Sequence, residues 1–161
     1  MQILSLTSDH DRQGFDCGRR ELNDWLQQVA RQHQDKGLSK TFVAIDREDP
    51  ARICGYHALT LAELENRHLP AEWSKKLPRR VPGIRLGRLA VDRRFQGQGL
   101  GELLLVDALT RAQRIYREAG GIGLFVDALD DRTAGYYRRF GFLATPDNPL
   151  LLFLPVGNLE I

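Results

Sequence analysis

Cysteine is scarce in this chain and long apolar runs are absent. The 161 residues include 2 cysteines, Cys17 and Cys54, which lie far apart and away from any histidine at metal-ligand spacing. The longest purely apolar run, Leu150–Leu154, is far shorter than the roughly 20 residues that cross a bilayer. The first ten residues lack the basic start and apolar stretch of a secretion signal. These features argue against a disulfide framework, a metal site and a membrane span, and they predict a cytoplasmic protein.

The composition is that of an ordinary globular protein. Apolar residues make up 42% and charged residues 27% of the chain, which are typical values. A chain of this length can bury a sufficient core without disulfides or structural metal. No linker or repeat divides the sequence, so we expect one domain over residues 1–161.

Positive charge is concentrated in one part of the chain. Between Arg67 and Arg94 there are nine lysines or arginines but only two acids, Glu72 and Asp92. Such a stretch either attracts a phosphate-rich partner or forms a solvated loop, and composition alone does not choose between them.

Apolar periodicity and turn residues predict alternating strands and helices. The expected helices are 19–35, 99–118 and 131–140, and the expected strands are 41–46, 52–61, 85–92, 122–129 and 150–155. The first two strands should form an antiparallel pair. The later alternation of strand and helix predicts a mixed α/β fold with at least one parallel pair.

A glycine loop lies between the strand 85–92 and the helix 99–118. Its sequence runs from Gln96 to Gly101 as QGQGLG. A helix start offers unpaired N–H groups and a positive dipole end, and glycines allow an anion to approach them. The dinucleotide fingerprint fails at Glu102, and the Lys-Ser/Thr ending of a nucleotide P-loop is missing. The alternative is a turn that only packs the helix on the strand.

The loop resembles the acyl-CoA binding loop of the GNAT family of N-acetyltransferases, Q/RxxGxG/A, with Gln96, Gly99 and Gly101 at the defined positions. The stretch from Ala134 to Phe142 resembles a second family motif. The resemblance implies a mostly antiparallel sheet flanked by helices, with a parallel pair splayed at the acetyl-CoA site. It also implies that no metal is used and that the coenzyme is bound by the following residues: Leu89, Ala90, Val91, Gln96, Gly97, Gln98, Gly99, Leu100, Gly101 and Glu102.

The same resemblance assigns the chemistry of acetyl transfer. Tyr137 aligns with the tyrosine that many members use as general acid, and a phenol can donate a proton to a departing thiolate. Tyr136 points about 100° away on a helix and is expected to pack. The backbone N–H of Val91 is expected to polarise the thioester carbonyl. No side chain stands out as a general base.

The chain further resembles GNAT toxins of toxin-antitoxin modules, which acetylate the α-amine of aminoacyl-tRNA and block translation. The matching segments are FDCG (15–18), SKTFVA (39–44), GYHAL (55–59), LPR (77–79), GRLAVD (87–92), QGQGLG (96–101) and VDA (126–128). This subgroup implies a ribbon-helix-helix antitoxin, a homodimer and a basic surface for tRNA. The candidates for that surface are Lys75, Lys76, Arg79, Arg80, Arg85, Arg93 and Arg94, whereas Arg88 could instead pair internally or touch coenzyme phosphate.

Two other functions stay open from the sequence. One is a housekeeping GNAT enzyme that acetylates a small amine, a metabolite or a protein N-terminus. The other is a catalytically silent module that binds CoA or a transcription partner. Capture of tRNA should weaken steeply with salt, whereas turnover of free amines should not.

Overall fold

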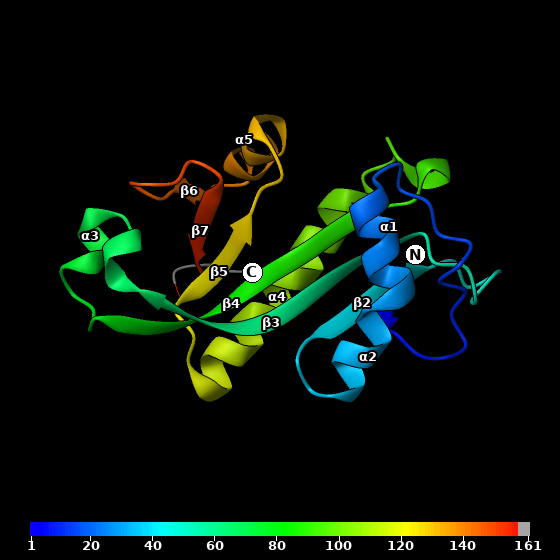
Figure 1. Cartoon of the computed structure of the whole chain (residues 1–161), viewed down its shortest axis with the longest axis horizontal. Coiled ribbons are helices and arrows are strands. Elements are labelled where there is room, and N and C mark those ends of the chain that lie inside the picture. Colours follow the sequence, from blue (N-terminus) through cyan, green and yellow to red (C-terminus); the bar gives the residue numbers. More distant parts are fainter. Residues whose placement is uncertain (158–161) are drawn as a thin grey trace. The chain divides into compact units, whose positions relative to one another are not determined.

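A computed structural model describes residues 1–157. Its strands form one seven-stranded sheet in the order β1-β2-β3-β4-β5-β7-β6 (Figure 1). The elements in chain order are β1 (Gln2–Ser5), α1 (Arg20–Gln28), α2 (Ala30–Asp35), β2 (Lys40–Ile45), β3 (Gly55–Glu65), η1 (Asn66–His68), α3 (Ala71–Ser74), β4 (Arg80–Val91), η2 (Arg93–Phe95), α4 (Leu100–Ala119), β5 (Gly123–Asp127), α5 (Asp131–Arg139), β6 (Leu143–Ala144) and β7 (Leu151–Pro155).

The chain divides into two compact units. Unit 1 consists of residues 1–60 and 87–108, and unit 2 consists of residues 61–86 with the chain from residue 109 onward. Several long elements contribute to both units: β3, β4 and α4 each begin in one and end in the other.

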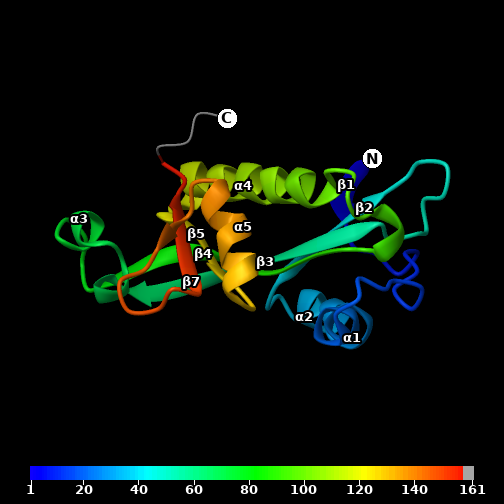
Figure 2. The ribbon, with the colours of Figure 1, turned by 90° about the horizontal axis from the view of Figure 1, so that it is seen from above.

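In unit 1, an antiparallel sheet carries helices on both faces (Figure 2). β2 pairs with β1 and with β3, and Val43 lies opposite Tyr56. Side chains alternate between the faces of a strand, so Val43 and Tyr56 join the α1 residues Leu22 and Leu26 in one apolar cluster. On the other face, a second apolar cluster is formed by Ala44, Cys54, Leu100 and Leu104.

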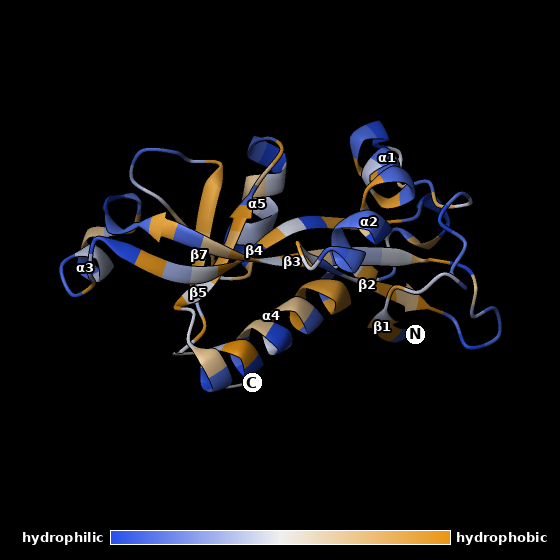
Figure 3. Ribbon diagram, turned by 60° about the horizontal axis from the view of Figure 1, so that its bottom comes forward, coloured by the Kyte–Doolittle hydropathy of each residue, from blue (hydrophilic) through white to orange (hydrophobic). Residues whose placement is uncertain are grey.

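A glycine on β3 allows α4 to lie close to the sheet. A Cβ on Gly55 would come within 2.8 Å of Leu104 Cδ1 and 3.0 Å of the Ala90 carbonyl oxygen. A side chain here would have to displace the Leu104 side chain and would crowd the backbone of the neighbouring strand. Figure 3 shows orange patches along α4, in keeping with its predicted apolar stripe.

In unit 2, β4 and β5 run parallel, with Ile84 opposite Leu124. β7 then pairs antiparallel with β5, and β6 pairs antiparallel with β7. Phe125 and Phe153 stack with ring centroids 4.9 Å apart and are fully buried. Their cluster also includes Leu64, Leu69 and Val81.

The structure confirms the mixed α/β fold, and it corrects several boundaries. The helix expected over 19–35 is two helices, because Val29 takes φ −118° and interrupts the helical path between α1 and α2. The strand expected over 52–61 is shifted to 55–65, and that expected over 85–92 begins earlier, at Arg80. β1 and β6 were not predicted, since four and two residues give too short a pattern. Among the described residues, no helix has the length and apolarity needed to span a membrane.

Candidate coenzyme and acetyl-transfer site

The glycine loop joins the end of β4 to α4 through the turn η2. Gly97 and Gly99 have φ of +76° and +79°, values that L side chains rarely adopt. A Cβ built on either glycine would meet nothing within 4 Å. The positive φ of the backbone therefore requires glycine at these two positions. Close packing of the helix on the strand does not require it, because no atom lies near either glycine.

The space beside the loop is accessible to an anion. Gln96, Gly97, Gln98 and Gly99 are all exposed, and α4 starts at the next residue. The first turn of a helix carries N–H groups without intrahelical partners and the positive end of the dipole. These residues fit a diphosphate group. Of the other predicted coenzyme residues nearby, Leu100 is buried, Gly101 half-buried and Glu102 exposed.

The side chain of Gln96 is engaged within the chain. Its Nε2 donates to the Val91 carbonyl at 2.9 Å and to the Cys17 carbonyl at 3.0 Å. It therefore fixes the start of the loop against β4 and against the turn that precedes α1. Sequence reasoning listed Gln96 among the coenzyme residues without anticipating these contacts.

Asp92 is a buried carboxylate at the base of the loop, with 1% of its surface exposed. Its Oδ1 accepts hydrogen bonds from the backbone N and Nε of Arg94, both at 3.0 Å, and its Oδ2 accepts one from the Asp16 backbone N at 3.1 Å. Burial alone would raise the pKa of Asp92, but the hydrogen bonds from Arg94 and Asp16 outweigh it and lower the pKa. The carboxylate is therefore charged at neutral pH.

The end of β4 supplies the other predicted coenzyme residues. Leu89 and Val91 are half-buried and pack against the cluster under α4. Ala90 faces the opposite cluster, beside α1. Because these side chains alternate between the two faces of the sheet, only the strand's backbone can offer all three residues to one ligand.

Tyr137 lies in unit 2, on the buried face of α5, with 5% of its surface exposed. Its ring packs edge-on against Phe142 at 5.4 Å and against Tyr136 at 5.5 Å. Burial raises the pKa of Tyr137, so the hydroxyl keeps its proton at neutral pH. That state is required of a proton donor.

Tyr136 has different surroundings. It is half-buried, and its ring contacts Phe140 at 5.1 Å and lies under the Arg139 guanidinium at 5.8 Å. The structure thus separates the two neighbouring tyrosines by burial, as their positions on a helix predict.

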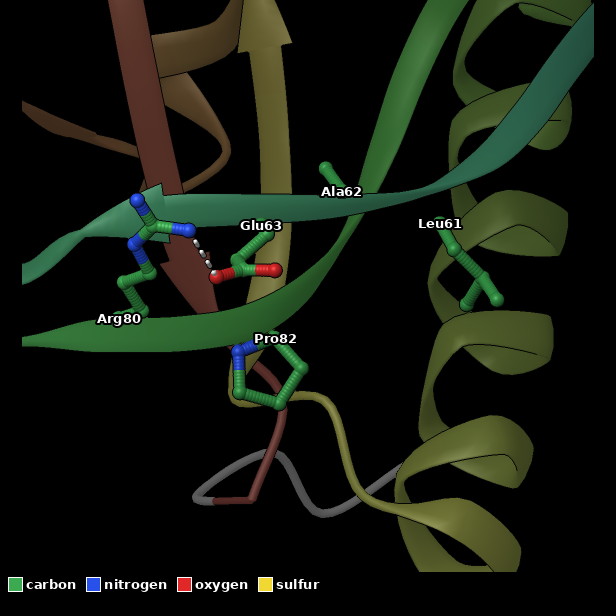
Figure 4. Close-up of a pocket in the computed structure, with 5 residues that line it drawn as sticks. All are labelled: Leu61, Ala62, Glu63, Arg80 and Pro82. Carbon is green, nitrogen blue, oxygen red and sulfur yellow. Dashed lines mark ion pairs between the residues drawn. The ribbon is translucent and has the colours of Figure 1, made fainter. Parts of the chain in front are cut away.

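The seven basic residues expected to receive tRNA differ in their surroundings. Lys75, Lys76, Arg79 and Arg80 are exposed. Arg80 lies 3.5 Å from Glu63, and Figure 4 shows the two side chains meeting beside a shallow pocket lined by Leu61, Ala62 and Pro82. Arg85 is half-buried and pairs with Asp127.

The remaining two basic candidates lie in unit 1. Arg93 is 3.7 Å from Asp16, and Arg94 pairs with Asp92. Arg94 is therefore part of the base of the loop as well as a surface cation.

Sequence reasoning missed an aromatic stack beside α1. The Arg88 guanidinium lies 5.2 Å above the Trp25 ring, and Trp25 stacks on Tyr56 at 6.1 Å with an interplanar angle of 8°. Tyr56 in turn donates to the Leu22 carbonyl at 2.7 Å. Arg88 thus makes an internal contact, one of the two roles considered for it. Tyr56 stood in a matched motif segment, but nothing in the sequence brought it together with Trp25.

His57 takes the opposite face of β3 from Tyr56. Its Nε2 is 2.7 Å from Asp107 Oδ2 on α4, and its side chain is fully buried. His57 belongs to the matched segment GYHAL, and the structure places its side chain against α4. No group of side chains among residues 1–157 has the arrangement of a metal site.

Comparison with known proteins identifies the family. Residues 37–143 match the model described as the acetyltransferase (GNAT) domain, and the chain belongs to this family of acetyltransferases. A tRNA-acetylating toxin of Mycobacterium tuberculosis is 35% identical over 144 residues, which cover 89% of this chain and 85% of that protein.

Solved structures agree in fold over nearly the whole chain. AtaT complexed with acetyl-methionyl-tRNAfMet has a TM-score of 0.89 and 33% identity, covering 97% of this chain and 95% of AtaT. A tyrosine-to-phenylalanine mutant of AtaT, bound to the C-terminus of the antitoxin AtaR and to acetyl-CoA, has a TM-score of 0.79 and 32% identity, covering 97% and 93%. The predicted family and fold are confirmed.

Proposed function

We propose that this protein is the toxin of a toxin-antitoxin module and transfers the acetyl group of acetyl-CoA to the α-amine of aminoacyl-tRNA in the cytoplasm. The observation that carries the proposal is the likeness to tRNA-acetylating toxins over nearly the whole chain. The open glycine loop and the buried Tyr137 lie in the two segments whose motifs suggested the family.

The coenzyme contacts follow from the loop. The backbone amides of residues 97–102 would bind the diphosphate, because the glycines leave them accessible at a helix start. The backbone of Leu89, Ala90 and Val91 would lie along the pantetheine arm, and the Val91 N–H would polarise the thioester carbonyl. Acetyl-CoA supplies the activated acetyl group.

Tyr137 would donate the proton that the departing thiolate requires. The phenol is protonated at neutral pH and can supply its proton to the thiolate sulfur as the carbon–sulfur bond breaks. The acceptor needs less assistance, because an α-amine with a pKa of about 7.8 is roughly 14% neutral at pH 7. A lysine amine is neutral about 0.04% of the time at the same pH.

The tRNA surface would be centred on the exposed residues Lys75, Lys76, Arg79 and Arg80, with Arg85, Arg93 and Arg94 as further candidates. We further propose that residues 1–161 act as one GNAT domain and that the protein forms a homodimer. A ribbon-helix-helix antitoxin would neutralise it.

The direct test is mass spectrometry of the amino acids carried by tRNA after induction of the protein without a partner. We expect acetylated aminoacyl-tRNA and growth arrest. Tyr137→Phe should reduce acetylation by about 100-fold, the lower end of what a general acid contributes. Tyr136→Phe removes a hydroxyl from the adjacent residue and serves as the matched control, with activity expected near wild type.

Two results would contradict the proposal. Healthy growth with soluble wild-type protein and unmodified tRNA would exclude a toxin. Acetylation of free amines at a rate insensitive to salt, with tRNA left untouched, would instead point to a housekeeping enzyme.

A further inference from the structure

The glycine loop is anchored to a distant part of the chain. The turn at residues 15–18, just before α1, is joined to the segment that follows β4 by three hydrogen bonds. They run from Asp16 N to Asp92 Oδ2 (3.1 Å), from Arg93 N to the Asp16 carbonyl (2.9 Å) and from Gln96 Nε2 to the Cys17 carbonyl (3.0 Å). Gln96 Nε2 also donates to the Val91 carbonyl at the end of β4 (2.9 Å).

The turn itself is held firmly. Asp16 Oδ1 accepts from Gly18 N and from Asn23 Nδ2, both at 2.9 Å, and Asn23 Oδ1 accepts from Cys17 N at 2.9 Å. Phe15 is buried, with its ring 5.4 Å from that of Tyr56. Phe15 therefore fixes the turn to the unit 1 core, and the turn can hold a neighbouring segment in place.

Asp92 transmits this anchoring to the loop. One carboxylate oxygen of Asp92 accepts a hydrogen bond from the turn, and the other accepts from the backbone and side chain of Arg94. The backbone N of Asp92 donates to the carbonyl of Cys54, just before β3, at 2.9 Å. Hydrogen bonds to a buried charged group are among the stronger ones in proteins. The start of the loop is thus tied to the turn before α1 and to the segment before β3.

Anion binding by backbone amides depends on where those amides point. A binding constellation must be held within about 0.5 Å of its productive geometry, and the glycines at positions 97 and 99 would otherwise leave the loop with many conformations. We propose that Asp92 and Gln96 are positioning residues, which bind no coenzyme atom through their side chains but hold the glycine loop in the geometry that receives the diphosphate. This inference rests on the proposed use of acetyl-CoA.

Asp92→Asn tests the proposal in the full-length protein. The asparagine side chain has the shape of aspartate, but it lacks the negative charge that holds Arg94, and it has one hydrogen-bond acceptor atom in place of two. We expect the KM for acetyl-CoA to rise about tenfold, the loss that one good hydrogen bond represents, and kcat at saturation to stay within about twofold. Asp46→Asn is the matched control, because Asp46 is an exposed carboxylate that accepts from Glu48 N in a surface turn.

S-acetylpantetheine separates positioning from general stability. This fragment carries the thioester but lacks the diphosphate, so acetyl transfer from it at saturating concentration should be equal in wild type and Asp92→Asn. If the buried substitution prevents folding, Gln96→Met gives the same test at an exposed position, because it removes the Nε2 donor to the carbonyls of Val91 and Cys17 without adding a charge beside the anion site.

Three results would overturn the inference. In the first, the variants keep the wild-type KM for acetyl-CoA. In the second, transfer from S-acetylpantetheine and from acetyl-CoA falls to the same extent, which means that Asp92 contributes stability alone. In the third, wild-type protein neither binds nor uses acetyl-CoA, and the proposed function fails together with the inference.

Discussion

The tip segment (75–80) and the loop segment (88–101) both concentrate basic residues, but their charges have different surroundings. In the tip segment, Lys75, Lys76 and Arg79 are exposed, and the Arg80 side chain is 69% exposed beside Glu63, whose side chain is 59% exposed. In the loop segment, Arg88 covers the Trp25 ring and Arg94 is bonded to the buried Asp92. The sequence shows a single basic stretch that contains two kinds of cation.

The difference suggests different roles. An exposed cation remains available to a diffuse phosphate backbone, where it contributes affinity without requiring exact placement. A cation bonded to a buried carboxylate holds local geometry, and its removal leaves a buried charge without compensation. We therefore propose that tRNA attraction rests mainly on the tip segment and coenzyme geometry mainly on the loop segment.

The largest expected effect comes from altering the loop segment itself. Gly99→Ala forces an L side chain into φ +79° and crowds the space that an anion would enter. We expect acetyl-CoA affinity, measured by calorimetry, to fall by about 100-fold, corresponding to two or so lost hydrogen bonds to a charged group. Gly37→Ala is the matched control, with φ +74° and an equally open surrounding. It should cost about 1–2 kcal/mol of stability and leave coenzyme affinity intact. An equal loss of affinity in both variants would refute the loop assignment.

The next prediction compares one arginine from each segment. Arg94→Gln removes the ion pair of a carboxylate whose side chain is 2% exposed, so the free energy of unfolding should fall by about 2 kcal/mol. Arg80→Gln breaks an exposed pair and should cost at most about 0.5 kcal/mol. Urea denaturation measures both values. Equal costs would show that the burial of the partner does not distinguish the segments.

The smallest effect is expected from neutralising the tip segment. Replacing Lys75, Lys76 and Arg79 by glutamine should weaken tRNA binding about tenfold at low salt and reduce the slope of log K against log salt by roughly 2 to 3. Acetyl-CoA affinity should not change. The control replaces Lys36, Lys40 and Arg47, which are also exposed, with the same change in charge. If both triple variants lose tRNA binding equally, net charge rather than the tip segment is responsible.

The elements that sequence reasoning located are those specified by local pattern. The α4 helix shows its apolar stripe within twenty residues, and Gly97 and Gly99 indicate a turn wherever they occur. The break at Val29 was not predicted, because the apolar spacing continues across it. The interruption is visible only in the backbone dihedral of Val29.

The anchoring of the loop could not be predicted in the same way. Asp16 and Asp92 are 76 residues apart, and no spacing rule joins them. Both stood in segments that matched the family, but their bond exists only because the turn before α1 and the end of β4 meet in the folded chain. The different roles expected of Tyr137 and Tyr136 are likewise easier to distinguish from their burial than from their order in the sequence.

The two tryptophans of the chain fall one in each compact unit. Trp25 is stacked on Tyr56 under a guanidinium, whereas Trp73 lies edge-on to Phe153 at 5.6 Å. Each unit thus carries its own fluorophore in a distinct environment. Forms of the protein that keep one indole at a time would report the melting of the two halves separately, and coincident curves are the signature of a single cooperative transition.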